Sequence, residues 1–234
     1  LQVGTGATTG SLGALSANVT NNGTLIFNRS DTLTYTGAFS GTGALTVATG
    51  GLNLNGGATY SGATALSADT AAPTSIAFNH NVPPSTTGFS GYGSVTIAPA
   101  AGSSFTSAFT PNYTFASTLT GLTLGSSSNT QNITLNSAIQ INGPITVDAG
   151  QVSFGSTLES TKANADTTIR AKTNIINTAL TTITTAGGNI LLASNVDDAT
   201  DGDTTTNGYI RLSSGLLATS NGGNITLGGG NLTG

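Results

Sequence analysis

Hydrophobic residues alternate with small or polar residues in short stretches along almost the whole chain. Two of the clearest stretches, Gly187–Leu192 and Gly222–Leu227, each begin with Gly-Gly-Asn-Ile. Alternation with a period of two is typical of β-strands, and no stretch has apolar residues at the three- and four-residue spacing of a helix. The pattern therefore predicts many short strands separated by glycine-rich turns, and no long helix.

The predicted strands are too short for each to bury a hydrophobic face by itself. Stacked as successive coils, they bury one interior and pair with the coils above and below. We therefore predict an all-β fold, a parallel β-helix or β-solenoid. A β-sandwich is the structural alternative, because regularly spaced short strands also describe one. Two observations favour the solenoid. Two-residue hairpin signals are few, and the Gly-Gly-Asn-Ile doublets are repeated in sequence order rather than mirror-paired. The residues predicted to face inward include Leu25, Leu45, Leu124, Ile145, Ile190 and Ile225.

The pattern divides the chain into three parts. Residues 1–68 hold regular strands, among them Thr24–Phe27 and Thr32–Tyr35, and a sharp turn is expected at Gly50-Gly51. Residues 69–116 hold most of the prolines and are predicted to be irregular, with a bulging loop at Asn79–Thr87. Regular strands return in residues 117–234. We expect residues 1–234 to be one solenoid segment of a longer chain, since the sequence lacks an initiator methionine and stops within its repeat pattern.

The charge of the chain excludes several classes of partner. Only 6% of the residues are charged, the net charge is −4, and Lys and Arg together number 5. A nucleic-acid or anionic membrane surface would require a basic patch, which this composition cannot supply. No apolar run approaches the roughly 20 residues that span a bilayer. Cysteine is absent, so the composition indicates no redox compartment.

An acidic cluster in the second half is the sharpest local feature of the sequence. It consists of Asp197, Asp198, Asp201 and Asp203, with Gly202 between the last two. Calcium prefers six to eight oxygen ligands, and a loop of this kind can supply several. The spacing departs from the EF-hand loop, because the first two aspartates are adjacent and no bidentate glutamate follows. The cluster is therefore either a calcium site or a solvated loop between coils, and no other cofactor is predicted.

The sequence predicts no catalytic residues. His80 is the single histidine and has no cysteine, glutamate or second histidine near it, so it is interpreted as a loop residue. Lyases and hydrolases with a β-helix fold need carboxylates or basic residues grouped along one groove. Half of the aspartates here fall in one loop instead. We therefore predict that the protein is not an enzyme.

Several segments resemble the repeats of large bacterial surface proteins. Val19–Asp31, Gly43–Val47 and Thr59–Thr64 resemble the autotransporter-associated β-strand repeat. The second half, from Thr168 to Gly230, resembles repeats of filamentous-haemagglutinin-like proteins. The resemblance implies a right-handed parallel β-helix, export from a Gram-negative cell and a place on the cell surface. It carries no shared catalytic residues.

These observations predict a non-enzymatic stalk or fibre segment of a secreted bacterial adhesin. Its expected partners are further coils of the same long chain or other copies stacked end to end as filaments, and host or matrix polysaccharide. One alternative is binding to ice, a surface or a glycan through threonine-rich faces such as Thr34–Thr36 and Thr181–Thr185. A polysaccharide-degrading β-helix enzyme is the other alternative, disfavoured because the carboxylates are not grouped along one groove.

Overall fold

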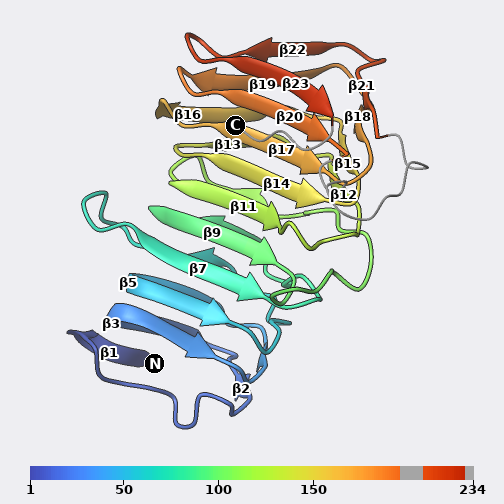
Figure 1. Ribbon diagram of the computed structural model, residues 1–234. Coiled ribbons are helices and arrows are strands. Elements are labelled where there is room, and N and C mark those ends of the chain that lie inside the picture. Colours follow the sequence, from blue (N-terminus) through green and yellow to red (C-terminus); the bar gives the residue numbers. More distant parts are fainter. Residues whose placement is uncertain (196–207, 230–234) are drawn as a thin grey trace. The chain divides into compact units, whose positions relative to one another are not determined.

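The computed structural model describes residues 1–195 and 208–229, and all regular secondary structure in these residues is β-strand (Figure 1). Every strand pair within the two units described below is parallel. The strands are stacked as successive coils, which confirms the predicted parallel β-solenoid. The alternative of two face-packed antiparallel sheets is therefore wrong.

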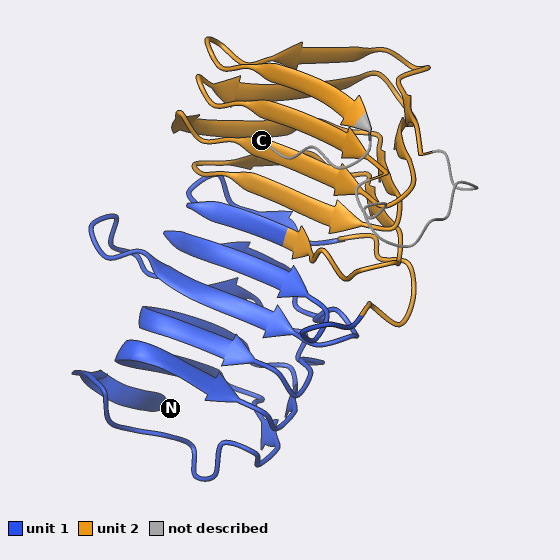
Figure 2. Ribbon diagram, in the orientation of Figure 1, with its two compact units in different colours: residues 1–103, 112–123 blue, residues 104–111, 124–234 orange. Residues whose placement is uncertain are grey.

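The chain forms two compact units (Figure 2). Unit 1 comprises residues 1–103 and 112–123, and unit 2 comprises residues 104–111 and 124–234. Strand β11 (Gly121–Gly125) crosses the boundary between them. The division at residues 68 and 116, which the repeats predict, stays a prediction.

Unit 1 is built from strands whose buried residues alternate with partly exposed ones. In β7 this alternation is complete, with Thr74, Ile76 and Phe78 buried, as expected for side chains that point to opposite faces in turn. The strands of unit 1 are β1 (Gln2–Ala7), β2 (Val19–Thr20), β3 (Thr24–Tyr35), β4 (Phe39–Ser40), β5 (Ala44–Leu54), β6 (Thr64–Ala65), β7 (Thr74–Asn79), β8 (Gly88–Ser90), β9 (Gly93–Ala98) and β10 (Thr114–Phe115).

Inward-facing residues of unit 1 form columns, with one residue from each coil. Leu33, Leu52, Ile76 and Val95 are paired in turn from β3 to β9, and all four are buried. The next column holds the larger side chains of Tyr35, Leu54, Phe78 and Ile97. Burial of such columns supplies the main stabilising free energy of a stack whose strands are individually short.

Two predicted strand boundaries in unit 1 instead lie within long strands. Thr24–Phe27 and Thr32–Tyr35 were expected as separate strands, but both belong to the 12-residue β3. The expected turn at Gly50-Gly51 likewise lies inside β5, where Gly50 has a φ of 68°. A residue in the left-handed region bends the strand without ending its pairing, because β3 and β5 continue in parallel after shifts in register. The predicted loop after Asn79 is present between β7 and β8.

Unit 2 is a more regular stack of coils with three strands each. The first complete coil contains β12, β13 and β14, and each later coil repeats this order. Its strands are β12 (Ile133–Leu135), β13 (Ile139–Ile141), β14 (Ile145–Ala149), β15 (Val152–Phe154), β16 (Leu158–Ala163), β17 (Thr167–Ala171), β18 (Ile175–Asn177), β19 (Thr181–Ala186), β20 (Ile190–Ser194), β21 (Ile210–Arg211), β22 (Leu216–Thr219) and β23 (Ile225–Gly229).

The Gly-Gly-Asn doublets occupy equivalent corners of successive coils in unit 2. A Cβ atom on Gly188 would lie 2.0 Å from the carbonyl oxygen of Ala165, and one on Gly223 would lie 2.2 Å from that of Gly188. Only glycine fits where backbones stack this closely. The amide of Asn224 donates to the side-chain Oδ1 of Asn189, 2.9 Å away. At each repeated corner, glycine therefore allows the backbones of neighbouring coils to approach closely, and asparagine forms a hydrogen bond between the coils.

Five of the six residues predicted to face inward are buried, and the sixth is not. Leu25, Leu45, Leu124, Ile145 and Ile190 are 0–2% exposed. Ile225 is 45% exposed although it is paired in register with the fully buried Ile190. Ile225 thus continues the inward-facing column as predicted, and it is exposed because β23 belongs to the last described coil and no further described strand of unit 2 covers it.

Candidate functional site

The predicted calcium ligands Asp197, Asp198, Asp201 and Asp203 lie outside the described residues. Their place in the repeat is nevertheless defined by the strands on either side. Sixteen positions separate Ser194 in β20 from Ile210 in β21, whereas four separate the equivalent residues of the coil before, Ala171 and Ile175. The acidic cluster thus falls where one coil has additional sequence, and its calcium binding stays a prediction.

The described residues contain no group of three or more His, Cys, Asp or Glu side chains that could hold a metal ion. Nor does this part of the chain contain a helix that is long and apolar enough to cross a membrane. His80 follows β7 in the predicted loop, where its Nδ1 atom lies 3.2 Å from the backbone amide nitrogen of Val82, which donates to it. The structure places no other titratable side chain in a hydrogen bond with this ring among the described contacts.

An ion pair connects two neighbouring coils on the outer face of unit 2. Asp148 of β14 and Arg170 of β17 are paired in register, and their side chains approach to 3.5 Å. Burial raises the pKa of Asp148, and the positive charge of Arg170 opposes this effect. One coil further, Ala193 occupies the equivalent position. The pair therefore connects two coils and does not continue as a charged row.

Unit 1 contains a charge cluster around Arg29 of β3, whose side chain is 9% exposed, while that of its partner Asp31 is 39% exposed. The guanidinium group of Arg29 donates to both carboxylate oxygens of Asp31 at 2.8 Å, and also to the backbone carbonyls of Thr8 and Gly10. The hydrogen bonds from Arg29 lower the pKa of Asp31. Arg29 thus holds the segment that follows β1 against β3.

Sequence reasoning did not assign a role to Arg29 and Asp31. A usable signal was present, because they are two residues apart and therefore point to the same side of a strand in a region with few charges. The segment that follows β1 makes two further contacts, with the end of β3 and the residue after it. The amide of Leu12 donates to the hydroxyl of the buried Tyr35 at 2.7 Å, and the amide of Thr36 donates to the carbonyl of Leu15 at 2.8 Å.

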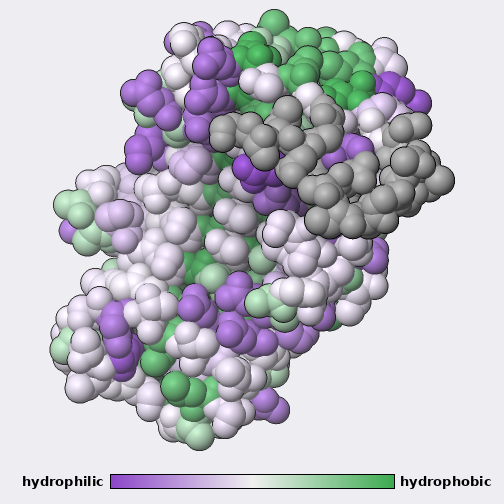
Figure 3. All heavy atoms as spheres, in the orientation of Figure 1, coloured by the Kyte–Doolittle hydropathy of each residue, from purple (hydrophilic) through white to green (hydrophobic). Residues whose placement is uncertain are grey.

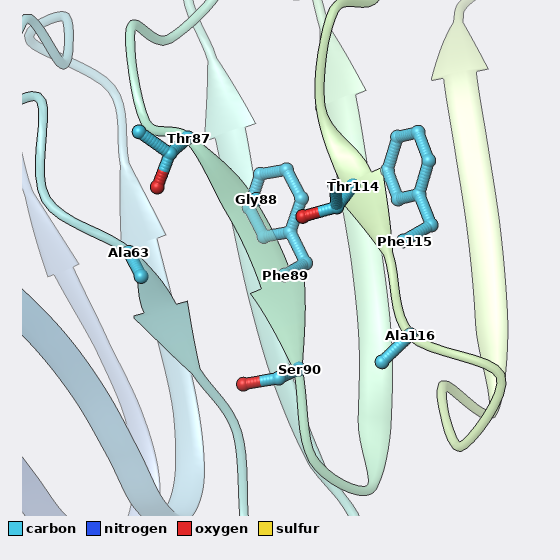
Figure 4. A pocket seen from close by; sticks show the side chains of 8 residues that line it. All are labelled: Ala63, Thr87, Gly88, Phe89, Ser90, Thr114, Phe115 and Ala116. Carbon is cyan, nitrogen blue, oxygen red and sulfur yellow. The ribbon is translucent and has the colours of Figure 1, made fainter. Parts of the chain in front are cut away.

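A shallow hollow lies on unit 1 between β6, β8 and β10 (Figure 4). The rings of Phe89 and Phe115 are stacked beside it, with centroids 5.7 Å apart, and the exposed hydroxyl groups of Ser90 and Thr114 lie near them. Its volume is about 200 Å³, below the roughly 300–1,000 Å³ of typical small-molecule sites. Its lining also includes Ala63, Gly88 and Ala116, and no charged side chain lines it.

The threonine-rich segments do not form a continuous threonine face. Along the outer column that contains Thr34, the paired residues in the next two coils are Asn53 and Ala77. In Thr181–Thr185, the side chains alternate between buried and partly exposed. The outward-facing Thr184 lies between Glu159 and Thr219. A flat array of threonines, as predicted for ice binding, is therefore not made by these two segments.

The last described coil of unit 2 is the most apolar exposed surface among these features. Figure 3 shows hydrophobic residues gathered at this end of the unit, around β22 and β23. Ile225 and Leu227 are 45% and 52% exposed, while their partners one coil earlier, Ile190 and Leu192, are fully buried. Strands β21, β22 and β23 each pair with one strand of the preceding coil and with no other described strand on their outer side. We call this surface the open end.

The fold defines a parallel β-solenoid, and the hollow beside Phe89 is smaller than a typical small-molecule site. The chain is similar to the adhesin BmaC autotransporter of Brucella suis biovar 1 (strain 1330), with 54% identity over 46 residues. The match covers 20% of this chain and 1% of the adhesin. No protein-family model matches the chain, and no solved structure matches it. The match and the fold together confirm the predicted resemblance to autotransporter-like surface proteins.

Proposed function

We propose that this chain is a non-enzymatic structural segment, a stalk, of a surface-exposed, adhesin-like protein. The observation that carries the proposal is the in-register stacking of parallel strands within each unit. In unit 2 a single column runs through Val147, Ile169, Leu192 and Leu227, one residue from each coil. Backbone hydrogen bonds in such a stack run from coil to coil, so a load along the stack is shared by many bonds.

The similarity to an autotransporter adhesin supports a location at the cell surface or outside the cell. It also supports a role in an adhesin rather than in an enzyme. The proposal is confined to the stalk and includes no adhesive target, filament assembly or polysaccharide binding, because the match covers only 1% of that adhesin. A stalk requires none of them, since its role is to hold another domain at a distance.

Deletion of one complete coil tests the proposal. Removing Lys172–Ser194 takes out β18, β19 and β20 and joins Ala171 to Asn195, which preserves register because Ala171 and Ser194 are equivalent. Removing Lys172–Thr182, about half a coil, misaligns the columns that follow. Each variant is displayed on a bacterium between a surface anchor and an amino-terminal peptide tag, and capture by tag-binding beads is counted.

A stalk predicts that capture survives removal of the whole coil and is lost on removal of the half coil. Replacement of the chain by a flexible Gly/Ser linker of equal residue number should also reduce capture, because a flexible, disordered linker does not hold the tag away from the cell. Equal capture through the flexible linker would overturn the proposal.

A further inference from the structure

An asparagine that is followed by glycine can modify itself, and five such pairs occur in the sequence. The backbone nitrogen of the glycine attacks the side-chain carbonyl carbon of the asparagine, so that a new C–N bond forms and the bond to the side-chain nitrogen breaks. Ammonia leaves with the proton of the glycine amide, and water then opens the cyclic imide to aspartate or isoaspartate. Glycine favours the reaction because it has no side chain to hinder the attack. The pairs are Asn22-Gly23, Asn55-Gly56, Asn142-Gly143, Asn207-Gly208 and Asn221-Gly222.

Folding decides which of these pairs reacts, because the asparagine side chain has to turn toward the following amide nitrogen. A carboxamide that is held in a hydrogen bond is kept away from that position. A glycine whose backbone lies tightly against another coil cannot move to accommodate the ring. These constraints are defined for four of the pairs, since Asn207 lies outside the described residues.

The first pair is constrained at both reacting groups. The Oδ1 atom of Asn22 accepts a hydrogen bond from the amide of Thr42 in the next coil, 3.1 Å away. The attacking nitrogen is also engaged, because the amide of Gly23 donates to the Oδ1 atom of Asn21 at 3.2 Å. Reaction at this pair would therefore break two hydrogen bonds.

Two further pairs are also constrained by neighbouring coils. The Oδ1 atom of Asn55 accepts from the side chain of Asn79 at 3.1 Å. A Cβ atom on Gly56 would lie 2.2 Å from a backbone carbonyl oxygen of the preceding coil, so this peptide has no room to rotate. The side-chain nitrogen of Asn221 donates to the carbonyl of Thr185 at 2.6 Å.

Asn142-Gly143 differs from these three pairs. Asn142 is exposed at the corner between β13 and β14, and no hydrogen bond in the described part of the chain involves its side chain or the amide of Gly143. The backbone on either side is nevertheless held by the next coil. The hydroxyl of Thr161 donates to the carbonyl of Ile141 at 3.1 Å, and the hydroxyl of Ser160 donates to that of Gly143 at 2.7 Å. The corner is therefore fixed in place while its two reacting groups are unoccupied.

We propose that Asn142 is a self-modification site, which deamidates through a cyclic imide with Gly143 in the folded protein while the other three described pairs are protected. The inference goes beyond the proposed stalk function. The isoaspartate product adds a methylene group to the backbone and a negative charge to the corner. Because β13 and β14 both pair in register with the next coil, the longer backbone no longer matches the spacing of the strands that it joins. Modification therefore loosens this corner after the protein has folded.

Incubation of the full chain at mildly alkaline pH, followed by peptide mapping with mass spectrometry, tests the proposal. Deamidation raises the mass of a peptide by about one unit, and fragment ions locate the change. The same incubation in concentrated urea is the matched control, because the fold no longer constrains any pair. We expect Asn142 to react about tenfold or more faster than Asn22 and Asn55 in the folded chain, since closed structure protects the latter two. In urea the three rates should converge.

A variant and a second measurement test the site and its consequence. Asn142→Gln should abolish the fast mass gain, because the longer side chain closes a larger ring more slowly. Amide exchange in β13 and β14 should be faster in the aged parent chain than in the fresh one, and it should be unchanged by ageing in the Asn142→Gln variant.

The other outcomes overturn the proposal. A rate at Asn142 that is equal to or slower than that at Asn22 in the folded chain would show that the open corner is not reactive. An advantage of Asn142 that persists in urea would assign the rate to the local sequence and not to the fold. Unchanged exchange in the aged parent chain would overturn the loosening of the corner.

Discussion

The first coil of unit 1 and the last described coil of unit 2 differ in what covers their inward-facing residues. In the first coil, the glycine-rich segment after β1 lies against the strand, and Arg29 binds its carbonyl groups. Its inward residue Val3 is therefore buried. In the last coil, Ile225 and Leu227 are in the same kind of position and stay exposed. Position within a strand sets the direction of a side chain, but only a neighbouring segment buries it.

The largest expected effect on stability comes from substituting corner glycines. Some of these glycines lie against the backbone of a neighbouring coil and others do not. A Cβ atom on Gly43 would lie 2.0 Å from the carbonyl oxygen of Gly23, whereas one on Gly23 would meet nothing within 4 Å. Gly43→Ala should therefore lower the free energy of unfolding by about 3 kcal/mol or more, because backbone would have to separate. Denaturant melts measure this, with Gly23→Ala as the matched control. Equal losses in both variants would contradict the close stacking.

Removal of the charge cluster should open the first coil and make the two ends alike. Arg29→Met removes the side-chain donors to Thr8, Gly10 and Asp31. We expect faster amide exchange in Gln2–Ala7 and in the segment after it, with unit 2 unchanged. Arg211→Met, at an exposed position of β21, is the control. If exchange in β1 is unaffected, Arg29 does not close this coil.

The same cluster predicts a pH dependence with a defined sign. Arg29 lowers the pKa of Asp31 in the folded state. The pair therefore stabilises the fold at any pH above the pKa of an aspartate in the unfolded chain, which is about 4. That contribution is lost as the pH falls through the lowered pKa of Asp31 in the folded state. Protection of β1 in the parent chain should therefore decline on acidification below about pH 4, and the Arg29→Met variant should show no such decline.

A smaller change is expected inside the regular coils of unit 2. Thr167 is fully buried in the column between Ile145 and Ile190, and its hydroxyl group has no hydrogen-bond partner among the described residues. Thr167→Val keeps the shape of the side chain and removes the unpaired group, so stability should rise by about 1–2 kcal/mol. Thr168→Val, on the outer side of the same strand, should change stability little. A loss of stability at position 167 would mean that its hydroxyl is satisfied.

The smallest effect is expected at Asp148. Burial raises the pKa of this carboxyl group despite Arg170. The folded state therefore favours the protonated carboxyl group, and stability declines as the pH rises through the raised pKa. Asp148→Asn should therefore stabilise the chain at pH 7 by less than about 1 kcal/mol, and the gain should vanish near pH 3. Thermal melts at the two pH values measure the difference. A gain that is equal at both values would exclude titration of Asp148 as its cause.

Much of the fold follows from the sequence because alternation defines which side of a strand faces the interior. Leu45 and Ile190 were located correctly from their own segments alone. The continuity of β5 through Gly50 was not predictable, because a left-handed glycine can either reverse a chain or bend a strand that stays paired. Only the neighbouring strand β3 decides between these outcomes.

The functional surfaces were harder to predict for a related reason. The exposure of Ile225 depends on whether another coil covers β23, and its own sequence pattern is the same as that of Ile190. The closure of the first coil depends on contacts of Arg29 with residues about twenty positions earlier. Neither kind of information is contained in a local pattern of hydrophobic and polar residues.

Amide hydrogen exchange of the unmodified chain tests the central comparison most directly. The account predicts slow exchange in β18, β19 and β20, which have paired strands on both sides, and much faster exchange in β21, β22 and β23. It also predicts that β1 exchanges more slowly than β23, because the segment after β1 closes the first coil. Protection of β21–β23 equal to that of β18–β20, at a dilution where the chain is monomeric, would contradict the account.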